Sequence, residues 1–242
     1  MPSAALRLSS AAPVVYPDSD GEPMADNTEQ FEFIQRVQAN LDAIRPDFVA
    51  GDHLWYPVEG RPDIRVAPDV YVAVGRPKGH RGSYRQWEEG GVPLTVVFEW
   101  WSPNSTFRKE LEKLQFYDRY GVDEFYTWDQ TRRFFTAFVR DGGELRPVDV
   151  TEGWVSPRLG IRFEVKDDTL VIFRPDGTPF LTLTEMETLR NAAVVERDGA
   201  LQERDGALKE RDGALKERDA AAARARALEE RLRALGIDPS SL

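Results

Sequence analysis

Two acidic side chains stand inside segments that otherwise have the composition of buried β-strands. Asp69 follows Pro68 at the head of the Val-rich segment DVYVAV, and Glu99 interrupts the apolar run VVFEWW. A carboxylate among apolar neighbours is costly unless it is paired, hydrogen-bonded or bound to a metal ion. If the two segments form neighbouring strands, both acids can point into one cleft and hold a hard divalent cation, Mg²⁺ or Mn²⁺, through oxygen ligands.

A lysine on the next helical segment completes this set. Tyr117 and Tyr120 follow Lys113 at i+4 and i+7, so the three side chains share one helix face and the ammonium group can reach back toward the end of the Glu99 strand. In phosphodiester hydrolysis, a metal ion polarises the phosphate and lowers the pKa of the attacking water, and a lysine offsets the charge of the transition state. The set is therefore physically coherent with phosphodiester hydrolysis, but its spacing alone is not specific for that chemistry.

Each of these residues also has a purely structural interpretation. Asp69 can be a turn residue that follows proline, and Glu99 can pair with a nearby arginine. Lys113 can lie on a solvated helix face, held by Glu110 at i−3. The basic segment RPKGHRGSYR, which includes His80, can contact phosphate, but such a charge run is more often a solvated loop. Spacing alone leaves these alternatives open.

Composition limits the kind of metal site and the strength of DNA binding. The chain has 242 residues, 41% of them hydrophobic, and a formal net charge of −10, so it can bury one core but is poorly suited to grip DNA without help. Bound cations would offset the negative charge of a carboxylate metal site. Because the chain has no cysteine and two histidines, disulfides and thiolate metal sites are excluded, and any metal must bind oxygen.

Other classes of protein find no support in the sequence. There is no apolar run of about 18 residues and no signal-peptide pattern at the N-terminus, so we expect a cytoplasmic protein with no membrane partner. No glycine cluster opens a helix that continues with Lys and Ser or Thr, so we expect no nucleotide cofactor.

The elements that must position the acids can be read from periodicity and turn signals. They predict an α+β fold with a central mixed sheet flanked by helices. The expected elements are a helix over 27–44 with an apolar stripe that includes Phe31, strands over 48–58 and 64–74, a central strand over 94–101, a helix capped near Asn104 or Ser105 with an apolar stripe of Phe107, Leu111, Leu114 and Tyr117, and strands over 125–128 and 134–139.

Three regions differ in composition. We expect a mobile arm over 1–26, a core with a small β extension over 27–184, and a charged helical tail over 185–242. In the tail, ERDGALQ and two copies of ERDGALK repeat with a period of seven and place Leu201, Leu208 and Leu215 on one stripe. This favours a long helix, a candidate coiled coil that could form a homodimer. Charged residues three or four positions from each leucine, and a glycine in each repeat that costs about 1 kcal/mol relative to alanine, predict that self-association is marginal.

Three linked motifs resemble a known family. The segments RVAPDVYVAVGRPKG, PLTVVFEWWSPNST and EKLQFYDRYGVDEFYTWD are similar to the Uma-type restriction endonucleases of the PD-(D/E)XK nuclease superfamily. The similarity is close over about 54–129 and looser over the β extension and the heptad tail. It implies a restriction-endonuclease-like core and Mg²⁺-dependent endonucleolytic hydrolysis of DNA phosphodiester bonds. The competing hypothesis is a catalytically inactive nuclease-fold module that acts in protein association through its C-terminal helix.

The resemblance also assigns roles to particular residues. It makes Asp69 and Glu99 the metal carboxylates, with the main-chain carbonyl of Trp100 as a further metal ligand and Lys113 as the catalytic lysine. In the superfamily the lysine normally follows the second acid by two residues, where this chain has Trp101. Secondary candidates and departures from the family pattern concern four other positions: Glu32 as an additional acid on the first helix, Tyr117 beside Lys113, Lys109 where the family helix often has Asp, and Glu110 as a replacement for that Asp.

Overall fold

The computed structural model describes residues 14–19, 21, 25–151 and 153–236. Contacts divide the chain into two units, Met1–Thr184 and Glu185–Leu242. Most of the segment 1–26, which the sequence predicts to be a mobile arm, lies outside the described residues. In its described part, the ring of Tyr16 packs against Tyr56 and Trp87, and the Tyr56 hydroxyl donates a hydrogen bond of 2.7 Å to the Pro17 carbonyl.

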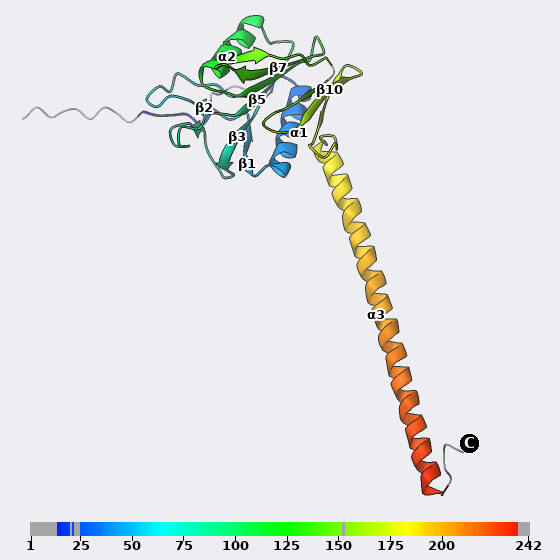
Figure 1. Ribbon diagram of the computed structural model, residues 1–242. Helices are drawn as coiled ribbons and strands as arrows, with labels where there is room; N and C mark the ends of the chain where they lie inside the picture. Colours follow the sequence, from blue (N-terminus) through cyan, green and yellow to red (C-terminus); the bar gives the residue numbers. More distant parts are fainter. Residues whose placement is uncertain (1–13, 20, 22–24, 152, 237–242) are drawn as a thin grey trace, which may run out of the picture. The chain divides into compact units, whose positions relative to one another are not determined.

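The first unit is built on a six-stranded mixed sheet with the strand order β1-β3-β5-β6-β7-β8. Strands β5 and β6 are parallel, and the other neighbours are antiparallel. This arrangement, with helices on the sheet (Figure 1), confirms the predicted α+β fold. The elements of this part are α1 (Thr28–Ile44), β1 (Asp47–Gly51), β3 (Val70–Pro77), β5 (Val96–Trp101), α2 (Phe107–Arg119), β6 (Glu124–Asp129), β7 (Phe134–Asp141) and β8 (Glu144–Pro147).

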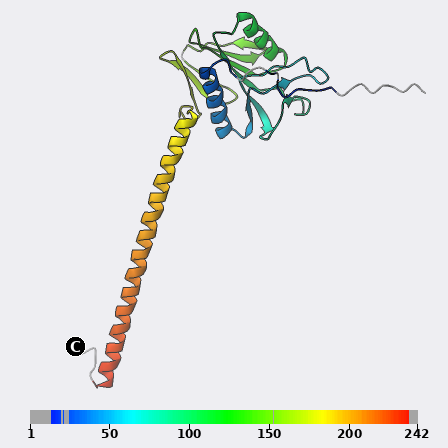
Figure 2. The same cartoon turned by 180° about the vertical axis from the view of Figure 1, so that it is seen from behind.

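The two faces of the sheet bury different side chains because successive residues of a strand point to opposite faces. One face, which includes Val70 and Phe98, packs against α1 and the β extension. The other face, which includes Tyr71 and Val97, packs against Tyr117 of α2. Figure 2 shows the same sheet from behind. Asp69 and Glu99 have the same parity as Tyr71 and Val97, so both acids belong to the α2 face.

The helix starts follow their capping residues, but the predicted apolar stripes are partly wrong. Asn27 caps α1, and its side chain accepts the Gln30 N–H at 2.9 Å. Phe31, expected on the inner stripe, is exposed, whereas Gln30 is buried. The cap of α2 is Thr106 rather than the predicted Asn104 or Ser105. Of the expected apolar stripe of α2, Tyr117 is buried and Leu114 is partly buried, but Phe107 is 75% exposed and Leu111 is exposed.

Two strand boundaries also differ from the prediction. The expected strand over 48–58 is interrupted after β1 by Asp52, whose φ of 46° is incompatible with an extended strand. A second short strand, β2 (Trp55–Tyr56), then pairs in parallel with β4 (Tyr84–Arg85). The expected strand over 64–74 begins only at Val70. Pro68 lies two residues before this start and has no N–H to donate to a neighbouring strand. Regular pairing therefore begins after it, and Asp69 lies just before the strand.

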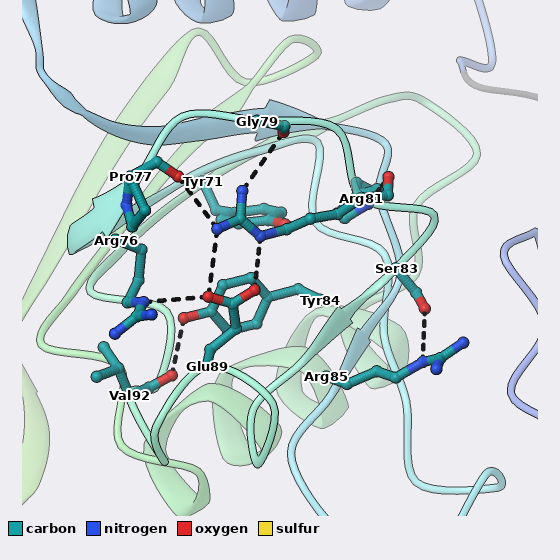
Figure 3. Close-up of polar contacts among 11 residues, drawn as sticks. Tyr71, Arg76, Pro77, Gly79, Arg81, Ser83, Tyr84, Arg85, Glu89 and Val92 are labelled. Carbon is teal, nitrogen blue, oxygen red and sulfur yellow. Dashed lines mark hydrogen bonds and ion pairs between the residues drawn. The ribbon is translucent and has the colours of Figure 1, made fainter.

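A partly buried carboxylate, that of Glu89, organises the connection between β3 and β5 (Figure 3). Glu89 accepts hydrogen bonds from Arg81 at 2.6 and 3.2 Å and from Arg76 at 3.0 Å. The Arg81 guanidinium also lies 4.0 Å from the centre of the Phe48 ring. In this segment, which the sequence left open as a phosphate contact, Arg76 and Arg81 are therefore paired with a carboxylate of the protein itself.

His53 ties the same connection to strand β3. Its Nε2 lies 3.0 Å from the Arg81 carbonyl, which can only accept, so Nε2 carries the proton and Nδ1 accepts from the Tyr71 hydroxyl at 2.6 Å. Burial lowers the pKa of His53, and the nearby Arg81 charge lowers it further. The neutral ring is therefore the form that the fold stabilises.

We expect His53 to make the protein less stable in mild acid. Because its pKa is lowered by folding, the stabilisation is complete above the unfolded pKa of about 6.5 and is lost as the pH falls toward the lower folded pKa. Urea unfolding of the wild type at several pH values should show this loss, and His53→Gln should reduce it. His80, the other histidine, is exposed, and His80→Gln is the matched control. Equal pH dependence in the wild type and His53→Gln would contradict the assignment.

The β extension is a three-stranded antiparallel sheet in the order β11-β10-β9, which confirms the prediction. Asp167 and Asp168, both at positive φ of 49° and 56°, form the two-residue turn between its longer strands. The side chains of Phe163 and Ile172 pack on the α1 face of the central sheet. The strands of the extension are β9 (Trp154–Val155), β10 (Arg162–Lys166) and β11 (Thr169–Phe173).

Nearly all of the described part of the second unit is one long helix, as predicted. Helix α3 (Leu183–Ala234) has 52 residues, none of them buried, and at 1.5 Å per residue it is about 78 Å long. The leucines of the heptad stripe, Leu201, Leu208 and Leu215, are all exposed. Coiled-coil pairing through this stripe stays a prediction. Among the described residues, no helix is both long enough and apolar enough to cross a membrane.

Candidate functional site

The two acids singled out from the sequence lie opposite each other on neighbouring strands. Strands β3 and β5 pair antiparallel with Val70 across from Phe98, and one further step along this register brings Asp69 across from Glu99. Both carboxyl groups are buried: Asp69 is 8% exposed and Glu99 is 1% exposed. The structure therefore brings together two carboxylates from separate strands, on the sheet face that α2 covers.

The Asp69 carboxylate is held by two donors from different elements. The Trp100 N–H donates to Oδ2 at 2.6 Å, and Nε2 of Gln30 in α1 donates to Oδ1 at 3.1 Å. Burial, and next the negative charge of Glu99, raise the pKa of Asp69 to about 7. Without a bound cation this carboxyl group is thus close to half protonated at neutral pH, and a cation would favour its ionised form.

The Glu99 carboxylate is held by helix α2. Lys113 Nζ donates to Oε2 at 2.6 Å, and the Tyr117 hydroxyl donates to Oε1. The two donors are four residues apart on one helix face, as the sequence predicts. Burial lowers the pKa of Lys113, but the charges of Glu99 and Asp69 outweigh this effect, so the net shift is upward. Lys113 pairs with Glu99 and not with Glu110, the alternative that the sequence left open.

The side chains of Asp69, Glu99 and Lys113 line a cleft with a volume of about 420 Å³. Its lining combines five acidic residues with two lysines, so the surplus of carboxyl groups disfavours the entry of an anion unless cations offset it. The lining residues are Ala25, Asp26, Gln30, Asp52, Val66, Ala67, Asp69, Glu99, Trp100, Trp101, Asn104, Ser105, Lys109, Glu110 and Lys113.

The donor set suits a hard divalent cation that keeps part of its water shell. Mg²⁺ is commonly bound by one or two carboxylates, with water and substrate phosphate as the other ligands. Within the described ranges, no group of three or more His, Cys, Asp or Glu side chains is placed to hold a metal ion. Trp100 lines the cleft, and because the N–H and C=O of an extended residue point to the same side, its carbonyl faces the strand edge where its N–H meets Asp69.

Comparison with known proteins identifies the family. Residues 19–166, more than half of the chain, match the family model Uma2, described as "Putative restriction endonuclease". The chain belongs to the Uma2 family. A search of curated proteins found no match. Among solved structures, the chain is similar to a crystal structure of a putative nuclease belonging to DUF820 from Anabaena variabilis, with a TM-score of 0.36 and 14% identity over 54% of this chain and 71% of that chain.

In this Uma2 chain, the first helix reaches the cleft through a residue that the sequence did not single out. Glu32, the predicted additional acid, is exposed and lines a separate depression with Arg36 and Arg133. Gln30 lies in the cleft instead, with its Oε1 accepting the Asp26 N–H at 2.8 Å. The spacing from Asn27 to Gln30 is that of a capping box, but no local pattern indicates that the Gln30 amide contacts Asp69.

Two further positions on α2 that the sequence analysis named, Glu110 and Lys109, also line the cleft. Glu110 is buried, and burial raises its pKa. Lys109 is exposed. By contrast, the four cations between Arg76 and Arg85 are all paired with carboxylates elsewhere: Arg76 and Arg81 with Glu89, Lys78 with Asp42, and Arg85 with Glu88.

Proposed function

We propose that this protein is a metal-dependent endonuclease that hydrolyses DNA phosphodiester bonds. The observation that carries the proposal is the convergence of Asp69, Glu99 and Lys113 in one cleft, two buried acids and one half-buried ammonium group. Membership of the Uma2 family supports the nuclease class. Acid, acid and lysine around a cation are the groups that phosphodiester hydrolysis requires.

Each residue has a role that follows from its position. Asp69, Glu99 and the Trp100 carbonyl would hold Mg²⁺ or Mn²⁺, which when bound polarises the phosphate and lowers the pKa of water. Lys113 has the more exposed side chain of the ion pair, with 33% of it accessible against 1% for Glu99, and it lines the cleft. It therefore faces the substrate side, where it can orient water and stabilise the charge of the transition state.

Tyr117 is assigned a positioning role. Its hydroxyl donates to Glu99 Oε1, and burial raises its pKa well above the usual value, so the hydroxyl keeps its proton. With one Glu99 oxygen fixed by Tyr117 and the other by Lys113, the carboxylate has a single orientation. A preset orientation reduces the entropy that metal and substrate binding must otherwise overcome.

The direct test is cleavage of supercoiled plasmid DNA with Mg²⁺ or Mn²⁺. We expect the wild type to convert plasmid to nicked and linear forms, and chelation of the metal to stop the conversion. Asp69→Ala should reduce the rate by at least about a hundredfold, since it removes a metal ligand. Asp63→Ala is a matched control, because Asp63 also follows a proline but is exposed and pairs with Arg61. Equal background cleavage by the wild type and Asp69→Ala would favour an inactive module that associates through its C-terminal helix.

A further inference from the structure

Lys109 is the one cleft lysine that the proposed chemistry does not use. It lies four residues before Lys113 on α2, and both side chains line the cleft. Residues four apart on a helix are neighbours on one face, with Cβ atoms about 5 to 6 Å apart. The lining therefore carries two cations one helical turn apart, and only Lys113 contacts the buried acids.

The carboxylates around Lys109 are engaged elsewhere or buried. Glu112, at i+3, pairs with Arg108 at 2.8 Å, and Glu99 pairs with Lys113. Over the ranges that the structure describes, Lys109 takes part in no ion pair, and its side chain is exposed. An exposed ammonium group without a carboxylate partner remains free to bind an anion that enters the cleft.

We propose that Lys109 binds a backbone phosphate of the substrate next to the one that is cleaved. This inference rests on the proposed nuclease function and names a substrate-binding residue of the same site. A nucleic-acid strand that presents one phosphate to Lys113 has a neighbouring phosphate within reach of the next turn of α2. Lys109 also offsets part of the repulsion that the five acidic residues of the lining exert on the strand.

The dependence of DNA affinity on salt concentration tests the proposed contact between Lys109 and a phosphate. Each phosphate neutralised by a cation contributes about 0.9 to the slope of log affinity against log salt for duplex DNA, or about 0.7 for a single strand. We would measure binding of a labelled DNA oligonucleotide by fluorescence anisotropy in Ca²⁺, to limit cleavage. Lys109→Gln should reduce the slope by one such step, which corresponds to roughly eightfold weaker binding to duplex at about 0.1 M salt. Lys109→Arg should keep the wild-type slope.

Arg119→Gln is the matched control, because Arg119 is an exposed cation on the same helix and is absent from the cleft lining. It should keep the wild-type slope. In the cleavage assay, Lys109→Gln should raise KM with little change in kcat. A wild-type slope and KM for Lys109→Gln, in a protein that still cleaves, overturns this inference alone. A wild type that neither binds nor cleaves DNA overturns the proposed function and the inference together.

Discussion

Replacing Lys113 with Met is expected to cost about 3 to 5 kcal/mol of unfolding free energy and to abolish cleavage. The substitution keeps a long side chain but leaves Glu99, which is 1% exposed, as a buried charge without its cation. Breaking a buried ion pair from one side has a cost of this size because the remaining charge is no longer compensated. Urea unfolding in the presence of a chelator measures the stability part.

A double variant separates the ion pair from general damage to helix α2. Glu99→Gln combined with Lys113→Met removes both charges, so we expect it to recover most of the lost stability, while cleavage remains absent. The Tyr117 hydroxyl can still donate to the glutamine oxygen. If Lys113→Met alone has wild-type stability, or if the double variant is as unstable as the single one, the ion pair is not what holds α2 to the sheet at this point.

Replacing Asp69 with Asn is expected to stabilise the metal-free protein by about 1 to 3 kcal/mol at pH 8 and to abolish cleavage. The pKa of Asp69 is raised to about 7 by burial and by Glu99, so ionising it in the fold costs on the order of 4 kcal/mol above that pH. The asparagine oxygen can accept the Trp100 N–H, but its amide then faces the Gln30 amide. Loss of that hydrogen bond removes about 1 to 3 kcal/mol of the gain.

The pH dependence of the unfolding free energy tests whether the pKa of Asp69 is raised by folding. An acid whose pKa is raised by folding leaves stability intact below its unfolded pKa of about 4 and lowers it as the pH rises toward 7. The stability gap between Asp69→Asn and the wild type should therefore widen from pH 4 to pH 7 and stay constant above. Mn²⁺ should stabilise the wild type at pH 8 but not the variant. A gap that does not change with pH would contradict the assignment of the raised pKa to Asp69.

The sequence was most informative where a residue broke its own local pattern. Asp69 and Glu99 stand out because strand periodicity demands apolar residues on both sides of them, and the structure buries both. Lys113 and Tyr117 were placed on one face by helical spacing alone, and both contact Glu99. The α+β fold followed from the order of periodic segments. The signals for the four site residues each lie within a few residues of chain.

Features that depend on distant partners could not be predicted. The contact between Gln30 and Asp69 joins residues 39 positions apart, and nothing in the first helix distinguishes this amide from a capping side chain. The exposure of Phe107 depends on how far α2 is rotated on the sheet, which its own sequence leaves undetermined. The pairing of Arg76 and Arg81 with Glu89 depends on how the β3–β5 connection folds back on itself.

The hydrogen bond from Gln30 makes the first helix a part of the cleft. Helix α1 is seated on the sheet by apolar side chains such as Phe33, Ile34 and Val37, and its amide fixes one oxygen of Asp69. A shift of α1 by a few tenths of an ångström would change these apolar contacts little. It is, however, comparable to the range of distances that a hydrogen bond such as that from Gln30 to Asp69 tolerates. The position of α1 on one face of the sheet thus helps to orient the Asp69 carboxylate on the other face. Substitutions that loosen the packing of α1 can therefore reduce the proposed activity in a protein that remains folded.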